Sequence, residues 1–366
     1  MKLLRAHVVG SMLRPKALLD QLPQYRAGAI DACNFKRVED AAVDEAIRIQ
    51  EDAGIDLVTD GEQRRLAFGD VVAQGVRGIE RSDFSAEASG MWNGEESLKR
   101  QALNSPTGGT IVGKLERGDS QVIEEFVYAR SRATKPIKVT LPSPTMFAAS
   151  WSPEKSARAY PTFAHAMEDI VNILQQEIHA LAKLGCRHVQ FDAPELTFAI
   201  DPKSMMLRNQ TRESFCAMVV EHLNAVAVEP GVTFSVHFCR GNARGLWHSA
   251  GGYEAISKLA FPGLKRFQYV LLEYDTDRAG GFEALGDLPD DCCAVLGLIT
   301  TKSARLETQQ ELKARIDDAS KYFSRAQLGL SPQCGFASDS GGNPLSMSDQ
   351  AAKLHLVAQV AHETWH

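Results

Sequence analysis

The chain has 366 residues, of which 44% are hydrophobic and 23% are charged, and its formal net charge is −6. This is the composition of a globular protein with a sizeable core, and scattered Lys and Arg residues give no sign of a nucleic-acid-binding surface. No apolar run approaches the roughly 20 residues of a membrane helix, and the N-terminal one is too short for a secretion signal. The seven cysteines lack the spacing of a disulfide scaffold. We therefore expect free thiols in a reducing cytoplasm, some of them bound to metal.

Strands alternate with helices along most of the chain. Each predicted strand is a short apolar run, and each predicted helix is a longer segment with apolar residues every three or four positions. Gly54 and Gly185 each stop a helix, and a strand begins directly after each of them. The predicted strands begin near residues 6, 55, 137, 187, 232, 267, 294 and 328. The predicted helices cover about 38–53, 160–184, 211–227, 253–259, 307–323 and 348–364.

This alternation predicts the fold. Eight strands with helices between them are most economically arranged as an α/β (β/α)8 barrel, the TIM barrel. An open, doubly wound sheet is the alternative, but no GxGxxG motif follows the first strand. We therefore expect a single catalytic barrel over residues 1–366.

The segment from about 82 to 134 interrupts the alternation. It is rich in Gly, Ser, Asn and Glu, and its apolar pattern is weak. Thr110–Leu115 and Val122–Tyr128 are predicted to pair as a hairpin around Gly118-Asp119. Roughly 50 residues of this composition could hardly bury a core of their own, so we interpret the segment as a hairpin-like excursion from the barrel after the second strand region.

Potential metal ligands stand at the ends of the predicted strands, where barrel enzymes place their chemistry. His237 and Cys239 are two residues apart on one strand and so share a face. Glu273 ends another strand, and Cys334 follows the last one. Taken alone, each would be an ordinary core residue. Together they supply one nitrogen, two sulfurs and one oxygen, which predicts a tetrahedral Zn²⁺ site.

The ligand set narrows the chemistry. Zinc holds an added thiol as the nucleophilic thiolate near neutral pH. Glu273 is the weaker, replaceable ligand and could yield to an incoming sulfur. Zinc sites that hydrolyse substrates with a bound water usually have His and carboxylate ligands, so this set indicates alkylation of a thiol.

Seven motifs resemble those of cobalamin-independent methionine synthase, specifically its C-terminal catalytic barrel. They are VVGS (8–11), TDGE (59–62), SPTMFAASW (143–151), QFDAPE (190–195), HFC (237–239), LLEYD (271–275) and SPQCG (331–335). The resemblance covers nearly the full chain and is strongest to the single-barrel members. It implies zinc on the four ligands. It also implies homocysteine bound by Ser11 at its carboxylate and by Glu62 and Asp192 at its ammonium. Trp151 matches the tryptophan that stacks on the folate pterin.

The residues themselves suit these roles but leave alternatives. Two carboxylates at a barrel mouth suit an ammonium, and the Gly10–Ser11 turn offers backbone N–H groups to a carboxylate. Alternatively, Asp60 and Glu62 cap the next helix, and Asp192 caps another. Trp151 could be an ordinary packing residue.

Two departures from the family concern the methyl donor. Thr300-Thr301-Lys302-Ser303 stands where the long synthases have D-I-H-S, whose histidine helps to activate methyl-folate, and Ala193 replaces the glutamate of a D-E-P motif. A lysine is normally charged and cannot accept the same proton. Lys302 is therefore the candidate catalytic residue of an altered donor site. The donor is 5-methyltetrahydrofolate or another methyl donor such as a methyl-corrinoid.

We therefore expect a cytoplasmic zinc methyltransferase that converts homocysteine to methionine, similar to 5-methyltetrahydropteroyltriglutamate–homocysteine methyltransferase. One alternative is a zinc alkyltransferase for another thiol, resembling epoxyalkane:coenzyme M transferase. Coenzyme M has no ammonium, so Glu62 and Asp192 favour an amino-acid thiol. The other alternative is a non-catalytic zinc-binding barrel. Lys302, in place of the family's histidine, is the residue that supports this alternative. The expected partners are small molecules, without nucleic acid or membrane, and the oligomeric state is open, a homodimer included.

Overall fold

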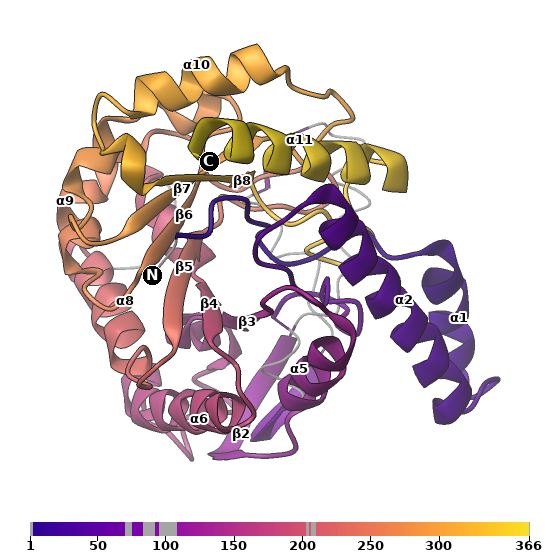
Figure 1. The fold of residues 1–366 in the computed structure, drawn as a ribbon. Helices are drawn as coiled ribbons and strands as arrows, with labels where there is room; N and C mark the ends of the chain where they lie inside the picture. Colours follow the sequence, from indigo (N-terminus) through magenta and orange to yellow (C-terminus); the bar gives the residue numbers. More distant parts are fainter. Residues whose placement is uncertain are drawn as a thin grey trace.

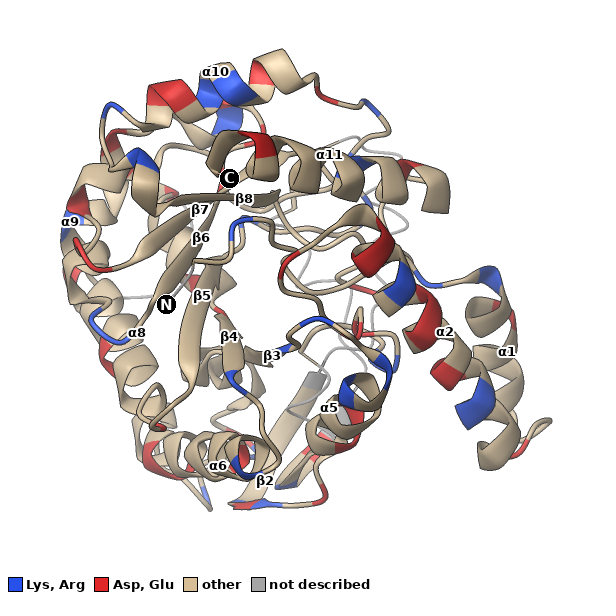
Figure 2. Ribbon diagram, in the orientation of Figure 1, with Lys and Arg blue, Asp and Glu red and all other residues tan. Residues whose placement is uncertain are grey.

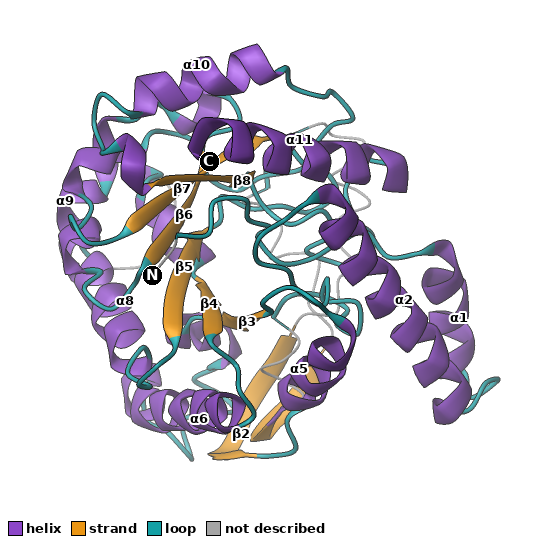
Figure 3. Cartoon of the chain, viewed as in Figure 1, coloured by secondary structure: helices purple, strands orange, loops and turns teal. Residues whose placement is uncertain are grey.

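The computed structural model describes residues 3–69, 75–82, 92–94, 108–202, 205 and 210–365. Within them, six parallel strands lie side by side in chain order and are surrounded by helices (Figures 1 and 3). The strands are β3 (Lys138–Pro142), β4 (His188–Asp192), β5 (Thr233–Phe238), β6 (Tyr269–Glu273), β7 (Cys293–Ile299) and β8 (Leu328–Pro332). Nearly every residue in them is buried, as expected for parallel strands covered by helices.

Two further parallel segments close the ring between β8 and β3. They are joined to their neighbours by isolated bridges, which pair Ala6 with Leu330, His7 with Leu57, and Val58 with Ile137. With these two segments the ring has the eight parallel members of a (β/α)8 barrel. The predicted fold class is therefore confirmed, although its first two strands are much shorter than the others.

The helices form the outer layer of the barrel. They are α1 (Lys16–Arg26), α2 (Ala32–Ala53), α5 (Gln121–Arg132), α6 (Phe163–Lys183), α8 (Arg212–Val226), α9 (Ser257–Ala260), α10 (Gln309–Ala319) and α11 (Met347–Trp365). Helix α2 ends at Gly54, whose φ of 88° only glycine adopts without strain. Helices α2 and α11 pack against each other, so elements from the two ends of the chain meet where the ring closes (Figure 1).

A separate antiparallel pair joins β1 (Val76–Ser82), just before the predicted excursion, to β2 (Gly108–Arg117) within it. The predicted hairpin is therefore right in kind but wrong in its pairing. Thr110–Leu115 lies in β2, whereas Val122–Tyr128 lies in helix α5. The β-branched and aromatic residues of Val122–Tyr128 are typical of a strand, but the buried positions on α5 recur with helical spacing. Most of the remaining segment, 83–91 and 95–107, lies outside the described residues.

Charged residues lie mainly on the outer helices and loops (Figure 2). Among the described residues, no helix combines the length and apolarity required to span a bilayer. Only a few charged side chains are buried among the strands, and they include Lys138, Asp192 and Glu273. Because burying a charge is costly unless it is paired or bound, these few residues mark the interior where chemistry is expected.

Candidate metal centre

The four predicted metal ligands converge at one point. His237 lies near the end of β5, Cys239 follows that strand, Glu273 ends β6, and Cys334 lies just beyond β8. Their potential ligand atoms all lie within 4.8 Å of one another. The Sγ atoms of Cys239 and Cys334 are 3.5 Å apart. This distance is far too long for a disulfide of about 2.0 Å and close to the roughly 3.8 Å between two sulfurs on a tetrahedral zinc.

Several of these ligand atoms lack a hydrogen-bond partner. His237 is only 1% exposed, yet neither of its ring nitrogens has a hydrogen-bond partner. Glu273 accepts the backbone N–H of Arg240 at 2.8 Å through Oε1, while Oε2 has no hydrogen bond and lies 3.6 Å from the guanidinium of Arg278. Leaving such atoms buried and unsatisfied is costly, and the donor set is one that zinc prefers. The residues therefore fit a bound Zn²⁺.

The ligands perturb one another's ionisation. A hydrogen bond from the Cys239 thiol holds the pKa of Cys334 well below its ordinary value, and the same contact raises the pKa of Cys239. Burial raises the pKa of Glu273 to about 7, and the charge of Cys334 adds to this. Burial opposes the charged form of His237, but the interaction with Cys334 outweighs it and raises its pKa to about 9. The metal-free cluster thus holds protons that a bound cation would release.

A hydrogen-bonded network joins the loops that carry the cysteines. Asn242 Nδ2 donates to the carbonyl of Gly335 at 2.6 Å, which links the loop after β5 to the loop after β8. Lys302, after β7, donates through Nζ to Gly241 O at 2.8 Å, Asn242 Oδ1 at 2.9 Å and Leu246 O at 3.2 Å. All three ammonium hydrogens of Lys302 are thereby engaged. A catalytic role for Lys302 stays a prediction.

Glu62 lies in the turn after the Leu57–Val58 segment. Both Gly61 and Glu62 have positive φ, 72° and 54°, a conformation that is uncommon for glutamate. Asp60 Oδ1 accepts the N–H of Glu62 at 2.9 Å and stabilises this turn. The carboxylate lies against Gly10, where an added Cβ would be 2.5 Å from Glu62 Oε1. The glycine of the first motif is therefore needed for this close approach.

Asp192 is the last residue of β4 and lies opposite His237 of β5 in the sheet register. Gln190 Nε2 donates to Asp192 Oδ1 at 2.7 Å. A short 3-10 helix, Pro194–Ala199, follows β4. No side chain caps its N-terminus, so Asp192 does not serve as its cap. Burial raises the pKa of Asp192 to about 7, and the charge of Glu62 adds to this shift.

Ser11 also lies beside the metal ligands. Its carbonyl accepts the N–H of Phe336 at 2.8 Å, and its Oγ accepts the N–H of Ala337 at 3.3 Å. A Cβ at Gly335 would clash with Ser11 Oγ. Ser11, Glu62 and Asp192 therefore gather around the loop and strand ends that carry the ligands.

Trp151 lies elsewhere, at the end of the 3-10 helix Pro144–Ser150 that follows β3. It is half-buried, packs on the core, and donates its indole N–H to Tyr160 O at 3.0 Å. These contacts account for ordinary packing, and a role in stacking stays a prediction.

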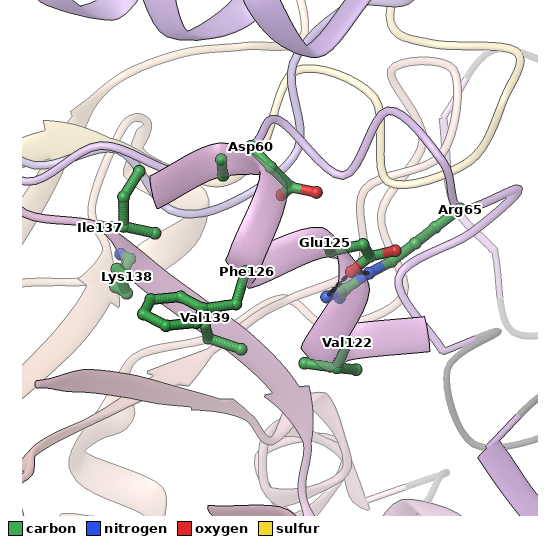
Figure 4. Close-up of a pocket in the computed structure, with 9 residues that line it drawn as sticks. Asp60, Arg65, Val122, Glu125, Phe126, Ile137, Lys138 and Val139 are labelled. Atoms are coloured by element: carbon green, nitrogen blue, oxygen red, sulfur yellow. Dashed lines mark hydrogen bonds and ion pairs between the residues drawn. The ribbon is translucent and has the colours of Figure 1, made fainter. Parts of the chain in front are cut away.

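The sequence reasoning missed the buried residues behind Glu62. Thr140 on β3 donates its Oγ1–H to Glu62 Oε1 at 2.7 Å. Arg65 donates to Thr140 Oγ1 at 3.0 Å and to Glu125 of α5 at 2.8 Å. Figure 4 shows the Arg65–Glu125 pair beside a small cavity that Asp60 and Lys138 also line. These residues hold one oxygen of Glu62 in place.

Comparison with known proteins identifies the family. A family model described as the catalytic domain of cobalamin-independent synthase matches residues 4–362. The chain belongs to this family. The family predicted from the seven sequence motifs is therefore confirmed.

Two relatives of this chain carry different kinds of name. YxjH of Bacillus subtilis, named as an uncharacterized protein, is 32% identical over 373 residues, which are 99% of this chain and 94% of the relative. The methionine synthase of Sulfolobus acidocaldarius is 23% identical and is matched over 90% of this chain and 84% of its own.

Two solved structures share the fold over almost the whole chain. One is the putative vitamin-B12-independent methionine synthase of Listeria monocytogenes, with a TM-score of 0.74 and 24% identity. The other is the B12-independent methionine synthase of Shewanella sp. W3-18-1 in complex with selenomethionine, with a TM-score of 0.75 and 19% identity. Each alignment covers 99% of this chain and 98% of the other.

Proposed function

We propose that the protein is a zinc-dependent S-methyltransferase that methylates the thiol of homocysteine to give methionine. The observation that carries the proposal is the convergence of His237, Cys239, Glu273 and Cys334 beside two buried carboxylates. This arrangement suits one small molecule that has both a thiol and an ammonium. Membership of the synthase family and the selenomethionine complex of the Shewanella relative support it.

In this proposal His237, Cys239, Glu273 and Cys334 hold one Zn²⁺. When bound, zinc lowers the pKa of a thiol so that its sulfur is a thiolate near neutral pH. Glu273 is the only oxygen donor of the four and hence the least suited to a soft thiolate-bound ion. The seven free cysteines support a reducing, cytoplasmic location.

The remaining residues bind the amino-acid part of the substrate. Glu62 and Asp192 each have one oxygen held by the protein, through Thr140 and Gln190. Glu62 Oε2 has no hydrogen-bond partner and is proposed to accept a proton of the ammonium. Ser11 is proposed to bind the carboxylate.

The reaction itself forms one bond and breaks one. The homocysteine sulfur attacks the methyl carbon of the donor, and a new S–C bond forms as the bond between the methyl group and the donor breaks. With 5-methyltetrahydrofolate, the broken bond is to N5, which keeps the electron pair and takes a proton. Lys302 is the proposed catalytic residue on the donor side, and Trp151 is the proposed surface for the donor's ring.

A donor screen tests this proposal. Zinc-loaded protein is incubated with homocysteine and with methyl-folate monoglutamate, methyl-folate triglutamate or methylcobalamin, and methionine is measured. We expect methionine from at least one donor. We expect almost none from a Glu62→Gln, Asp192→Asn double variant at the same homocysteine concentration. Glu177→Gln, which removes a buried carboxylate on α6, controls for the loss of charge.

Two outcomes favour the alternatives. Stoichiometric zinc without methionine from any donor indicates a non-catalytic zinc-binding barrel. Methylation of coenzyme M as efficient as that of homocysteine, and unaffected by the double variant, indicates an alkyltransferase for another thiol.

A further inference from the structure

The barrel interior next to Glu62 and Asp192 contains a buried lysine that the proposed reaction does not use. Lys138 of β3 is 2% exposed. Its Nζ donates to Val8 O and to Gln190 Oε1, both at 2.6 Å. In the described part of the chain it forms no ion pair, and burial lowers the pKa of Lys138 to about 7, a shift that the charges of Asp192 and Glu62 oppose. A buried amine without a carboxylate partner is costly to charge, so its position needs an explanation.

Lys138 fixes the orientation of the Gln190 side chain. Lys138 Nζ donates both of its hydrogen bonds, so the Gln190 amide turns its oxygen towards Lys138. The amide nitrogen of Gln190 then faces the other way and donates to Asp192 Oδ1 at 2.7 Å and to Val9 O at 2.9 Å. Without this donor, the amide could rotate its oxygen towards the carboxylate and repel it.

The same side chains hold the segment that leads to Ser11. This segment has only isolated bridges to its neighbours. Its carbonyl groups are held by side chains instead: Val8 O by Lys138, Val9 O by Gln190, and Gly10 O by Thr59 Oγ1 at 2.7 Å. One network therefore reaches both Ser11 and Asp192, the proposed contacts for the two ends of an amino acid.

We propose that Lys138 is a positioning residue that, through Gln190, makes the site selective for thiols that carry an α-ammonium. The proposal rests on the proposed function, because it assigns Asp192 to the ammonium of the substrate. Lys138 keeps Oδ1 of Asp192 bonded to Gln190, so the remaining lone pairs of the carboxylate are presented in one orientation. Substrate selectivity is then set by a residue that does not contact the substrate.

Equilibrium binding tests the proposal without a methyl donor. Zinc-loaded protein is titrated calorimetrically with L-homocysteine and with 4-mercaptobutanoate, which keeps the thiol and carboxylate but lacks the ammonium. We expect Lys138→Met to weaken homocysteine binding by about 10- to 100-fold, as for loss of a hydrogen bond to a charged group. Binding of 4-mercaptobutanoate should change by less than about threefold, since it makes no such bond.

Matched variants keep the test decisive. Gln190→Leu should reproduce the selective loss, and the Lys138→Met, Gln190→Leu double variant should bind homocysteine no more weakly than either single variant. If Lys138→Met fails to fold, the Gln190→Leu result decides. Lys353→Met is the control, because Lys353, on α11, is also fully buried but bonds to Glu307, between β7 and α10. It should leave both affinities unchanged.

The outcomes separate two failures. Equal weakening of both thiols, or no weakening of either, overturns the role of Lys138 and leaves the proposed function standing. Wild-type protein that retains zinc but binds no homocysteine overturns both.

Discussion

The two parts of the barrel ring are built in different ways. From β3 to β8, neighbouring strands share continuous ladders of paired residues, and all four metal ligands come from this part. Between β8 and β3, the two remaining segments share only isolated bridges, and they lead to Ser11 and Glu62. The backbone ladder thus positions the candidate metal ligands and Asp192, whereas the positions of Ser11 and Glu62 depend on side chains. Substitutions in the second part are expected to alter substrate recognition without disturbing the metal.

Gln50 shows how a side chain replaces the missing ladder. It lies on α2 and is fully buried, with 0% exposure. Its Oε1 accepts the N–H of Thr59 at 2.9 Å, and its Nε2 donates to Thr59 O at 2.9 Å. These are the two hydrogen bonds that a neighbouring strand would provide.

The largest expected effect is on zinc binding by the part of the ring from β3 to β8. Cys334→Ser should weaken zinc binding by about 1,000-fold, roughly 4 kcal/mol, which is one ligand's share of the 10–16 kcal/mol of a four-ligand structural site. Competition with a chromophoric chelator measures this. Cys293→Ser, a buried cysteine of β7 outside the cluster, serves as the control. If Cys334→Ser bound zinc with wild-type affinity, the placement of the metal centre in this part of the ring would be contradicted.

Gln50→Leu tests the part held by side chains. It leaves both backbone groups of Thr59 unsatisfied, so the free energy of unfolding should fall by about 2 to 4 kcal/mol. Urea unfolding measures the loss, with Gln359→Leu at a half-buried position of α11 as the control. Zinc affinity should change by less than about threefold, as for sites that are not coupled. A large fall in zinc affinity would show that the two parts are not independent.

Lys302→Met tests the link between the loops that carry the cysteines. Loss of three hydrogen bonds to the loop after β5 should weaken zinc binding by about 10- to 100-fold, the range for residues that support metal ligands. The chelator competition measures this as well. The rate of methionine formation at saturating zinc separates the two roles of Lys302. A wild-type rate indicates that Lys302 only supports the loops that carry the cysteines. A reduced rate supports the predicted catalytic role.

The smallest expected effect is a pH dependence near β4. Burial, with the charge of Lys138 adding, lowers the pKa of His188 to about 4 from an ordinary value of 6.5. The unfolded chain therefore binds more protons between pH 6.5 and 4, so stability falls as the pH falls through this window. His188→Gln should reduce that fall by about 1 to 2 kcal/mol. Urea unfolding at pH 7.5 and pH 4.5 gives the free energy of unfolding of both proteins. The same loss of stability between the two pH values in both proteins would exclude this contribution.

Much of the barrel and of the metal centre could be predicted because each rests on local signals. Glycines such as Gly54 mark the ends of helices, apolar runs mark the strands, and His237, Cys239, Glu273 and Cys334 all stand at strand ends. Helix α5 was missed because Val122–Tyr128 has the β-branched and aromatic residues of a strand, and its helical period becomes evident only from which side chains are buried.

The support behind the carboxylates depends on which strands are neighbours. Lys138 and Thr140, like Gln190 and Asp192, are polar residues at alternate positions of an otherwise apolar strand, which indicates a polar interior face. The sequence does not say that β3 and β4 pair with Lys138 opposite His188. Without that register, the contact between Lys138 and Gln190 could not be predicted.

The order of the metal ligands along the chain has a consequence for biosynthesis. A growing polypeptide exposes His237, Cys239 and Glu273 before Cys334 is made, and Cys334 follows β8, which pairs with β7 and closes the ring onto Ala6. Until then the nascent chain offers an incomplete set of three donors. The strand that completes the set of four donors is therefore the same strand that closes the barrel.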